Sequence, residues 1–196
     1  MTLSKALVPS QSLLTRALMV AGGSAFIALA AQVSVPMLPV PMTLQTLAIL
    51  LVGFAFGARM GVATLLAYLA EGAMGLPVFA NGMNGIAFFG PTAGFLVGFV
   101  AMAAIAGYAA DRGVKGVVAT AAVALFASAF IYLPGVAWAM SLAEVAGIDT
   151  AKWGADSFAM VWQYYMSPFL IGDAVKAVLA ALIVTGGWAA LKSRKA

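Results

Sequence analysis

The sequence contains neither cysteine nor histidine, and only 8% of its 196 residues are charged. These absences exclude disulfides, thiolate or imidazole metal sites and a histidine general base. A soluble domain of this size carries about 25% charged residues. Ten basic and six acidic side chains cannot give the chain a hydrated surface. Part of that surface must therefore face lipid.

The rest of the sequence is strongly apolar, with 64% hydrophobic residues and a mean hydropathy of +1.07. A spanning helix needs about 20 apolar residues. Apolar stretches cover 14–33, 43–56, 62–74, 93–110, 117–140 and 167–191. The second and third are short, so flanking residues or tilt must complete them. The sequence predicts an all-α, polytopic membrane protein with six transmembrane helices in one domain, residues 1–196.

The N-terminus resembles a signal peptide, because Lys5 and Arg16 precede an apolar run. No charge follows until Arg59, which makes the run longer than the apolar core of a signal peptide. We therefore expect the first helix to be retained.

The basic residues predict the orientation in the membrane. In a six-helix arrangement eight of the ten lie on one side, whereas Lys152 lies on the other side with three acidic residues. The positive-inside rule then places both termini in the cytoplasm of a protein in the cell inner membrane. The pI of about 9.6 thus reflects orientation and not a nucleic-acid partner. The eight are Lys5, Arg16, Arg59, Arg112, Lys115, Lys192, Arg194 and Lys195.

Two charges inside the last apolar stretch are the leading candidates for a binding site. Asp173 and Lys176 lie three residues apart, so they share one face of a helix. Charged side chains at membrane depth face the bundle interior and usually mark a functional site. The alternative is a structural ion pair that holds this helix against a neighbour.

Two uncharged loops on the predicted outer side are further candidates. The loop GLPVFANGMNGIAFFGPT contains Asn81 and Asn84. Their carboxamides can bind a ligand, or they can satisfy the backbone of a turn. The segment PVPMTLQT places Thr43 and Gln45 after a proline-stiffened connection that loses little entropy when it closes over a ligand. An ordinary helix connector with Thr43 as N-cap is the alternative.

Other side chains are candidates for supporting roles. Tyr68 and Glu71 can line a site, although Glu71 equally suits a solvated helix end. Small residues at four-residue spacing let helices approach closely. We expect internal packing for Gly53, Gly57, Gly90, Gly94 and Gly98, and either packing or an external docking face for Ala17, Ala21 and Ala25.

Several catalytic motifs are missing. The sequence has no GxxxxGK[ST] phosphate loop, no Ser–His pair and no HExxH motif. It also shows no obvious inverted repeat of the kind common in secondary transporters. We expect a binding protein with no catalytic residues, metal or cofactor of its own, whose energy comes from elsewhere.

Five sequence blocks occur in the order of a known family: PVPMTLQTLAILLVG, GARMG, YLAEGAMGLPVFANGMNG, FFGPTAGFLVGF and GDAVKA. Together they resemble the BioY family, the biotin-specific substrate-capture (S) subunits of energy-coupling factor (ECF) transporters. The resemblance implies a six-helix S-component bundle with its site near the outer face, and a lid formed by the loop after the first helix. It implies biotin contacts for Asp173, Lys176 and either Asn81 or Asn84. The alanine stripe would dock on a transmembrane coupling subunit.

The chemistry of biotin suits these groups. Its ureido ring offers two N–H donors and one acceptor to Asp173 and to a Lys176 or Asn donor, although Lys176 can instead take the valerate carboxylate. Apolar and aromatic walls for the rest of the ligand are expected from Phe79, Phe88, Phe89 and Tyr164.

The resemblance implies capture of biotin from outside, followed by delivery with the coupling subunit and two ATPase subunits that use ATP. Transport by the chain alone or by a homo-oligomer stays open. The alternatives are a proton-coupled secondary carrier, a membrane enzyme acting on lipids with Glu71 or Asp173 as base, and a structural assembly factor.

Overall fold

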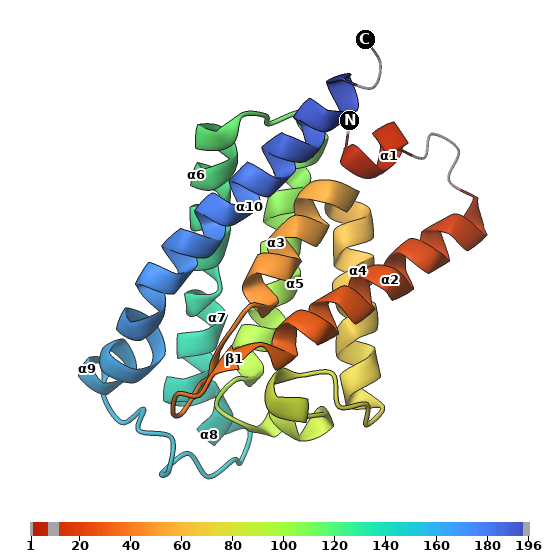
Figure 1. Ribbon diagram of the computed structural model, residues 1–196. Coiled ribbons are helices and arrows are strands. Elements are labelled where there is room, and N and C mark those ends of the chain that lie inside the picture. Colours follow the sequence, from red (N-terminus) through yellow and green to blue (C-terminus); the bar gives the residue numbers. More distant parts are fainter. Residues whose placement is uncertain (1, 8–11, 194–196) are drawn as a thin grey trace.

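The computed structural model describes residues 2–7 and 12–193, so Arg194 and Lys195 of the predicted basic set lie outside the described residues. Four helical stretches are long and apolar enough to cross a membrane, namely Leu13–Gln32, Ala93–Asp111, Val117–Val145 and Phe158–Ser193. The helices Gln45–Phe56 and Ala58–Ala73 lie between them in the chain. Each of the six predicted stretches is therefore helical (Figure 1).

The first half of the chain carries α1 (Leu3–Leu7), α2 (Leu13–Gln32), a hairpin of β1 (Ser34–Val35) and β2 (Met42–Thr43), α3 (Gln45–Phe56), α4 (Ala58–Ala73) and the short 3-10 helices η1 (Ala80–Gly82) and η2 (Gly85–Phe89). The second half carries α5 (Ala93–Asp111), α6 (Val117–Phe130), α7 (Tyr132–Ala137), the π-helical turn η3 (Trp138–Leu142), α8 (Ala143–Val145), α9 (Phe158–Val161), the π-helical turn η4 (Trp162–Met166) and α10 (Ser167–Ser193).

Two helix boundaries differ from the prediction. The motif GARMG is not a loop, because α4 begins at Ala58 and only Gly57, with a φ of 83°, makes the turn from α3. Asp111 at the end of α5 accepts a hydrogen bond of 2.9 Å from the Ala58 amide. The last span begins at Phe158 and not near Ser167, since the η4 turn continues the helix.

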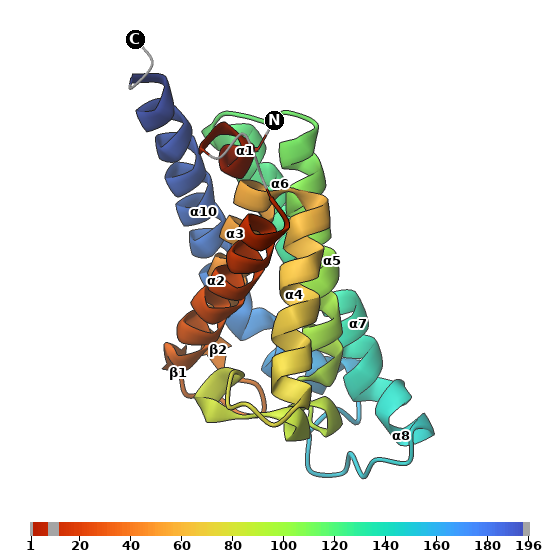
Figure 2. The same cartoon turned by 90° about the vertical axis from the view of Figure 1, so that its right-hand side faces the viewer.

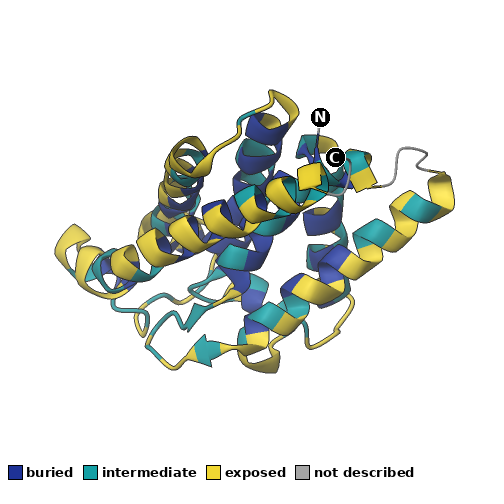
Figure 3. Ribbon diagram, turned by 45° about the horizontal axis from the view of Figure 1, so that its top comes forward, coloured by how far each residue is buried: buried dark blue, intermediate teal, exposed yellow. Residues whose placement is uncertain are grey.

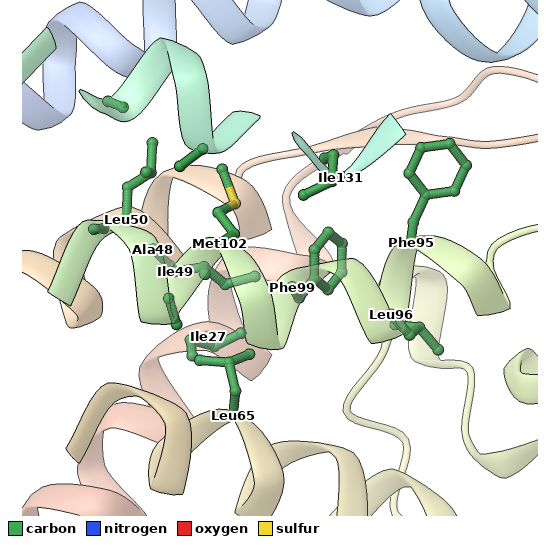
Figure 4. Close-up of a cluster of buried hydrophobic side chains, with 14 of the residues drawn as sticks. Ile27, Ala48, Ile49, Leu50, Leu65, Phe95, Leu96, Phe99, Met102 and Ile131 are labelled. Atoms are coloured by element: carbon green, nitrogen blue, oxygen red, sulfur yellow. The ribbon is translucent and has the colours of Figure 1, made fainter. Parts of the chain in front are cut away.

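α5 forms the centre of the bundle and packs against α3, α4, α6 and α7. Its buried face joins Ile49 of α3, Leu65 of α4 and Ile27 of α2 in one apolar cluster (Figure 4). Lipid is as apolar as these side chains, so van der Waals packing is what favours their contact. Gly94 illustrates the internal packing predicted for the glycines, because a Cβ there would lie 2.2 Å from the Pro134 carbonyl oxygen.

α2 is the least embedded of the long spans and crosses the bundle obliquely (Figures 1 and 3). Gly23, Ser24, Ile27 and Ala31 form its buried face. The alanine stripe Ala17, Ala21 and Ala25 lies on its exposed face, as a docking surface requires.

The charges separate toward the two ends of the bundle. Figures 1 and 2 show α1, the start of α2, the α3–α4 corner, the α5–α6 connection and the end of α10 at one end. All the described members of the predicted basic set lie on these segments. The hairpin, η1, η2 and the loop after α8 lie at the other end. The prediction that the basic segments lie together at one end of the bundle is therefore confirmed. The cytoplasmic location of that end stays a prediction.

Candidate ligand-binding cavity

A cavity opens between the hairpin, the η1–η2 loop and the spans α5, α6–α7 and α10. It has about 750 Å³ of space between its lining atoms, including the part open to the outside. A typical small-molecule site is mostly apolar, with a few placed polar groups, and this lining has that character. The lining residues are Val40, Pro41, Met42, Thr43, Gln45, Thr46, Phe79, Ala80, Met83, Ala87, Thr92, Phe95, Leu96, Phe99, Ile131, Tyr132, Tyr165, Phe169, Asp173 and Lys176.

Asp173 and Lys176 form the charged part of this wall. The Lys176 ammonium lies 3.5 Å from the Asp173 Oδ1 and donates a hydrogen bond of 3.0 Å to the Thr46 hydroxyl. The Tyr132 hydroxyl donates to the Asp173 Oδ2 over 2.6 Å. All four side chains are buried. Lys176 has three N–H donors, so one stays available, and the carboxylate keeps acceptor capacity toward the cavity.

A second polar group enters the cavity from α3, and its orientation is fixed by a hydrogen-bond chain. The Val78 carbonyl can only accept, and it receives the Tyr68 hydroxyl proton over 2.8 Å. Tyr68 must therefore accept from Gln45, whose Nε2 lies 2.8 Å from the hydroxyl. This arrangement turns the Gln45 Oε1 away from Tyr68. Gln45 thus offers an acceptor to a ligand, and Tyr68 supports it from outside the lining.

Aromatic rings form much of the remaining wall. Phe79 is buried and meets Tyr68 and Phe88 edge to face, with ring centroids 5.3 and 5.5 Å apart. Phe95 meets Tyr132 in the same way at 6.1 Å. Phe79 was among the expected wall residues. Phe88 packs behind it, outside the lining.

The hairpin and the η1–η2 loop cover the cavity at the end of the bundle opposite the basic segments. Val40, Pro41 and Met42 of the hairpin line it directly. Met42 rests on α10 at Gly172, where a Cβ would lie 2.8 Å from the Met42 Sδ. The Thr43 hydroxyl accepts a hydrogen bond of 3.1 Å from the Gln45 amide, which stabilises the start of α3.

Gln32, the last residue of α2, ties this cover to the bundle. Its Nε2 donates to the Phe79 carbonyl and its Oε1 accepts from the Gly82 amide, each over 3.0 Å. The Ser34 hydroxyl donates to the Asn81 carboxamide oxygen over 2.8 Å. The side chains of Gln32 and Asn81 therefore hold the hairpin and the η1 loop together.

Both predicted asparagines lie outside the lining, where the Asn81 side chain bonds to Ser34 and the Asn84 side chain bonds to loop backbone. Asn81 has a φ of 57°, a left-handed conformation that asparagine tolerates better than most residues. The Asn84 Oδ1 accepts from the Ile86 amide over 3.3 Å. This is the turn-satisfying role that the sequence offered as the alternative. A ligand contact by either residue stays a prediction.

Three more predicted residues lie away from the cavity. Glu71 accepts a hydrogen bond from the Ser24 hydroxyl, which joins α4 to α2, so it is not a solvated helix end. Phe89 and Tyr164 are exposed, at 69% and 40%. Tyr165 takes the place expected of Tyr164: it is buried in the cavity wall and donates to the Trp153 carbonyl over 2.8 Å. The helical twist explains the exchange, because neighbouring residues on a helix face different directions.

Sequence reasoning missed Tyr132, Thr46 and Phe169. Thr46 directly follows Gln45, and Phe169 lies one helical turn before Asp173. Their positions beside predicted residues were a usable signal. Tyr132 had none, because a single tyrosine in an apolar span gives no sign of its partner 41 residues away.

These features define a class of protein: a polytopic helical membrane protein that encloses a small-molecule site near one end of its bundle. The family of the chain is more specific than this class. The chain belongs to the BioY family, whose family model matches residues 4–193.

Curated relatives agree with this membership. The chain is 38% identical over 162 residues to a protein of Rhizobium etli called biotin transporter BioY, covering 77% of this chain and 79% of that one. It is 33% identical to the protein of the same name from Thermotoga maritima, covering 82% and 88%.

A solved structure is also similar in fold. It is the S-component for biotin from an ECF-type ABC transporter, which matches with a TM-score of 0.67 at 24% identity and covers 93% of this chain and 92% of that one. The six-helix bundle is therefore the S-component fold.

Proposed function

We propose that this chain is the biotin-binding S subunit of an ECF-type vitamin uptake transporter. The observation that carries the proposal is the buried cluster of Asp173, Lys176, Tyr132 and Thr46 in an aromatic cavity. The names of similar proteins support biotin as the ligand, because those proteins are called biotin transporters.

The cavity suits the two chemical ends of biotin. The Asp173 carboxylate and the Gln45 Oε1 can accept the two ureido N–H groups, while the spare N–H of Lys176 donates to the ureido oxygen. The phenyl rings of Phe79, Phe95 and others suit the thiophane ring and the valeryl chain. In this pose the ligand's valerate carboxylate points away from Lys176.

Delivery across the membrane needs partners in this proposal. The chain has no nucleotide-binding loop, so ATP is used by separate ATPase subunits joined through a transmembrane coupling subunit. The exposed alanine stripe on α2 is the proposed contact with the coupling subunit.

Binding of radiolabelled biotin to the purified chain in detergent tests the proposal. We expect saturable binding that Asp173→Asn abolishes. Asp156→Asn is the matched control, because it makes the same chemical change at an exposed position. Absence of binding by a folded, monodisperse parent would overturn the proposal.

Biotin methyl ester tests the pose. It lacks the carboxylate charge, and we expect its affinity to stay close to that of biotin. A large loss of affinity for the ester would instead place the carboxylate at Lys176.

A further inference from the structure

The end of the molecule at which the cavity lies has two halves that differ sharply in charge. The cover of the cavity consists of residues 33–44 and 74–92, which we call the roof, and it contains no charged residue. The loop 143–157 in the other half carries Glu144, Asp149, Lys152 and Asp156, all of them exposed. In Figure 2 the hairpin and the η1–η2 loop lie below α2 and α4, whereas α8 lies on the opposite side.

The roof also exposes large apolar side chains. Leu38 at the hairpin tip is 89% exposed, and Ile86 and Phe89 in η2 are 72% and 69% exposed. Met74 and Val35 are exposed as well. Soluble surfaces rarely gather so many apolar side chains with no charge among them, and such patches mark contact with another apolar phase.

This surface continues the exposed apolar face of α2. Leu29 and Val33 are 70% and 57% exposed, and they lead directly into Val35 of the hairpin. α2 is a spanning helix of the family fold, so its exposed face meets lipid. Two polar side chains lie on the path from that face to Leu38. Gln32 and Ser34 are both hydrogen-bonded to the η1 loop.

We infer that the roof lies in the headgroup layer of the adjoining leaflet, with phospholipid covering its exposed apolar side chains, while the loop 143–157 stands in water. The headgroup layers together add about 10–15 Å to a hydrocarbon core of about 30 Å. The interface accommodates surfaces that are apolar with polar tips, whereas burial of the four charged side chains of the loop 143–157 in lipid would be costly. The cover of the cavity is therefore a lipid-facing element.

Spin labelling tests this placement directly, because the chain contains no cysteine and each introduced thiol is the single labelling position. Leu38→Cys and Ile86→Cys report on the roof, and Asp149→Cys is the control on the charged loop. The labelled proteins are reconstituted in vesicles of three parts phosphatidylcholine to one part phosphatidylglycerol. Collisions of each label with oxygen, which enters lipid, are compared with collisions with a water-soluble nickel chelate.

We expect the ratio of oxygen to nickel accessibility at residues 38 and 86 to exceed that at residue 149 several-fold. A ratio at either roof position equal to that at residue 149 overturns the inference. Dipolar broadening between labels at residue 38 also overturns it, since a second copy of the chain would then cover the roof. The readout involves no ligand, so it is independent of the assignment of biotin.

Discussion

The Asp173–Lys176 pair allows a sharp test of whether these charges serve binding as well as structure. Asp173→Asn leaves the Lys176 charge without a partner, and Lys176→Met does the same to Asp173. The combination of both substitutions removes both charges while the Asn amide oxygen still accepts from Tyr132.

The magnitudes follow from the geometry. Two unit charges 3.5 Å apart attract with about 5 kcal/mol at an effective dielectric constant of about 20. Removing one partner of a buried pair destabilises a protein by about 3–5 kcal/mol. In the combined variant the main remaining cost is the Thr46 hydroxyl that loses its donor, about 1–3 kcal/mol. The combined variant should therefore be more stable than either single variant.

Equilibrium unfolding in mixed maltoside and dodecyl sulfate micelles, followed by the fluorescence of the four tryptophans, measures these free energies. Radiolabelled biotin binding is measured on the same samples. We expect all three variants to lose binding, although the combined variant stays folded. A combined loss of stability equal to the sum of the single losses would refute the ion-pair reasoning. Retained binding by the combined variant would show that the pair is only structural.

Three other substitutions address single contacts. Tyr132→Phe removes the hydroxyl that orients the carboxylate. Because a hydrogen bond to a charged group contributes about 1.5–3 kcal/mol, we expect biotin affinity measured by calorimetry to fall about 10- to 100-fold. An unchanged affinity would contradict this role. Gly172→Ala displaces Met42 and should speed biotin release several-fold in a filter assay. Gly186→Ala is the control, because its Cβ would meet nothing within 4 Å, and it should not change the rate. Equal release rates would argue against closure of the hairpin over the cavity at the Met42–Gly172 contact. Asp111→Ala removes a cap of α4 and should lower the free energy of unfolding by about 1 kcal/mol, with biotin affinity unchanged. A loss of affinity would mean that this distant end of the bundle affects the site.

The helices and their grouping at two ends were predictable from the sequence, because apolar length and the positions of Arg59, Arg112 and Lys115 depend only on local composition. The boundaries were less predictable. The α3–α4 turn needs only Gly57, which adopts a positive φ that other residues rarely adopt. The π-helical turn before α10 continues a helix that composition alone would end.

The site was predictable only where membrane depth made a side chain conspicuous. Asp173 and Lys176 stand out because charge is rare inside a span. Tyr132 and Tyr165 do not, since tyrosine occurs equally at membrane interfaces. Asn81 and Asn84 were attractive candidates for their chemistry, yet the folded loop uses their carboxamides for its own backbone and for Ser34.

Gln32 connects α2 to the cover of the cavity by hydrogen bonds. This side chain lies at the end of a 20-residue helix, and it donates to the Phe79 carbonyl and accepts from the Gly82 amide. α2 is a mostly exposed span, so a movement of this helix within the membrane would also displace the loop beside the cavity.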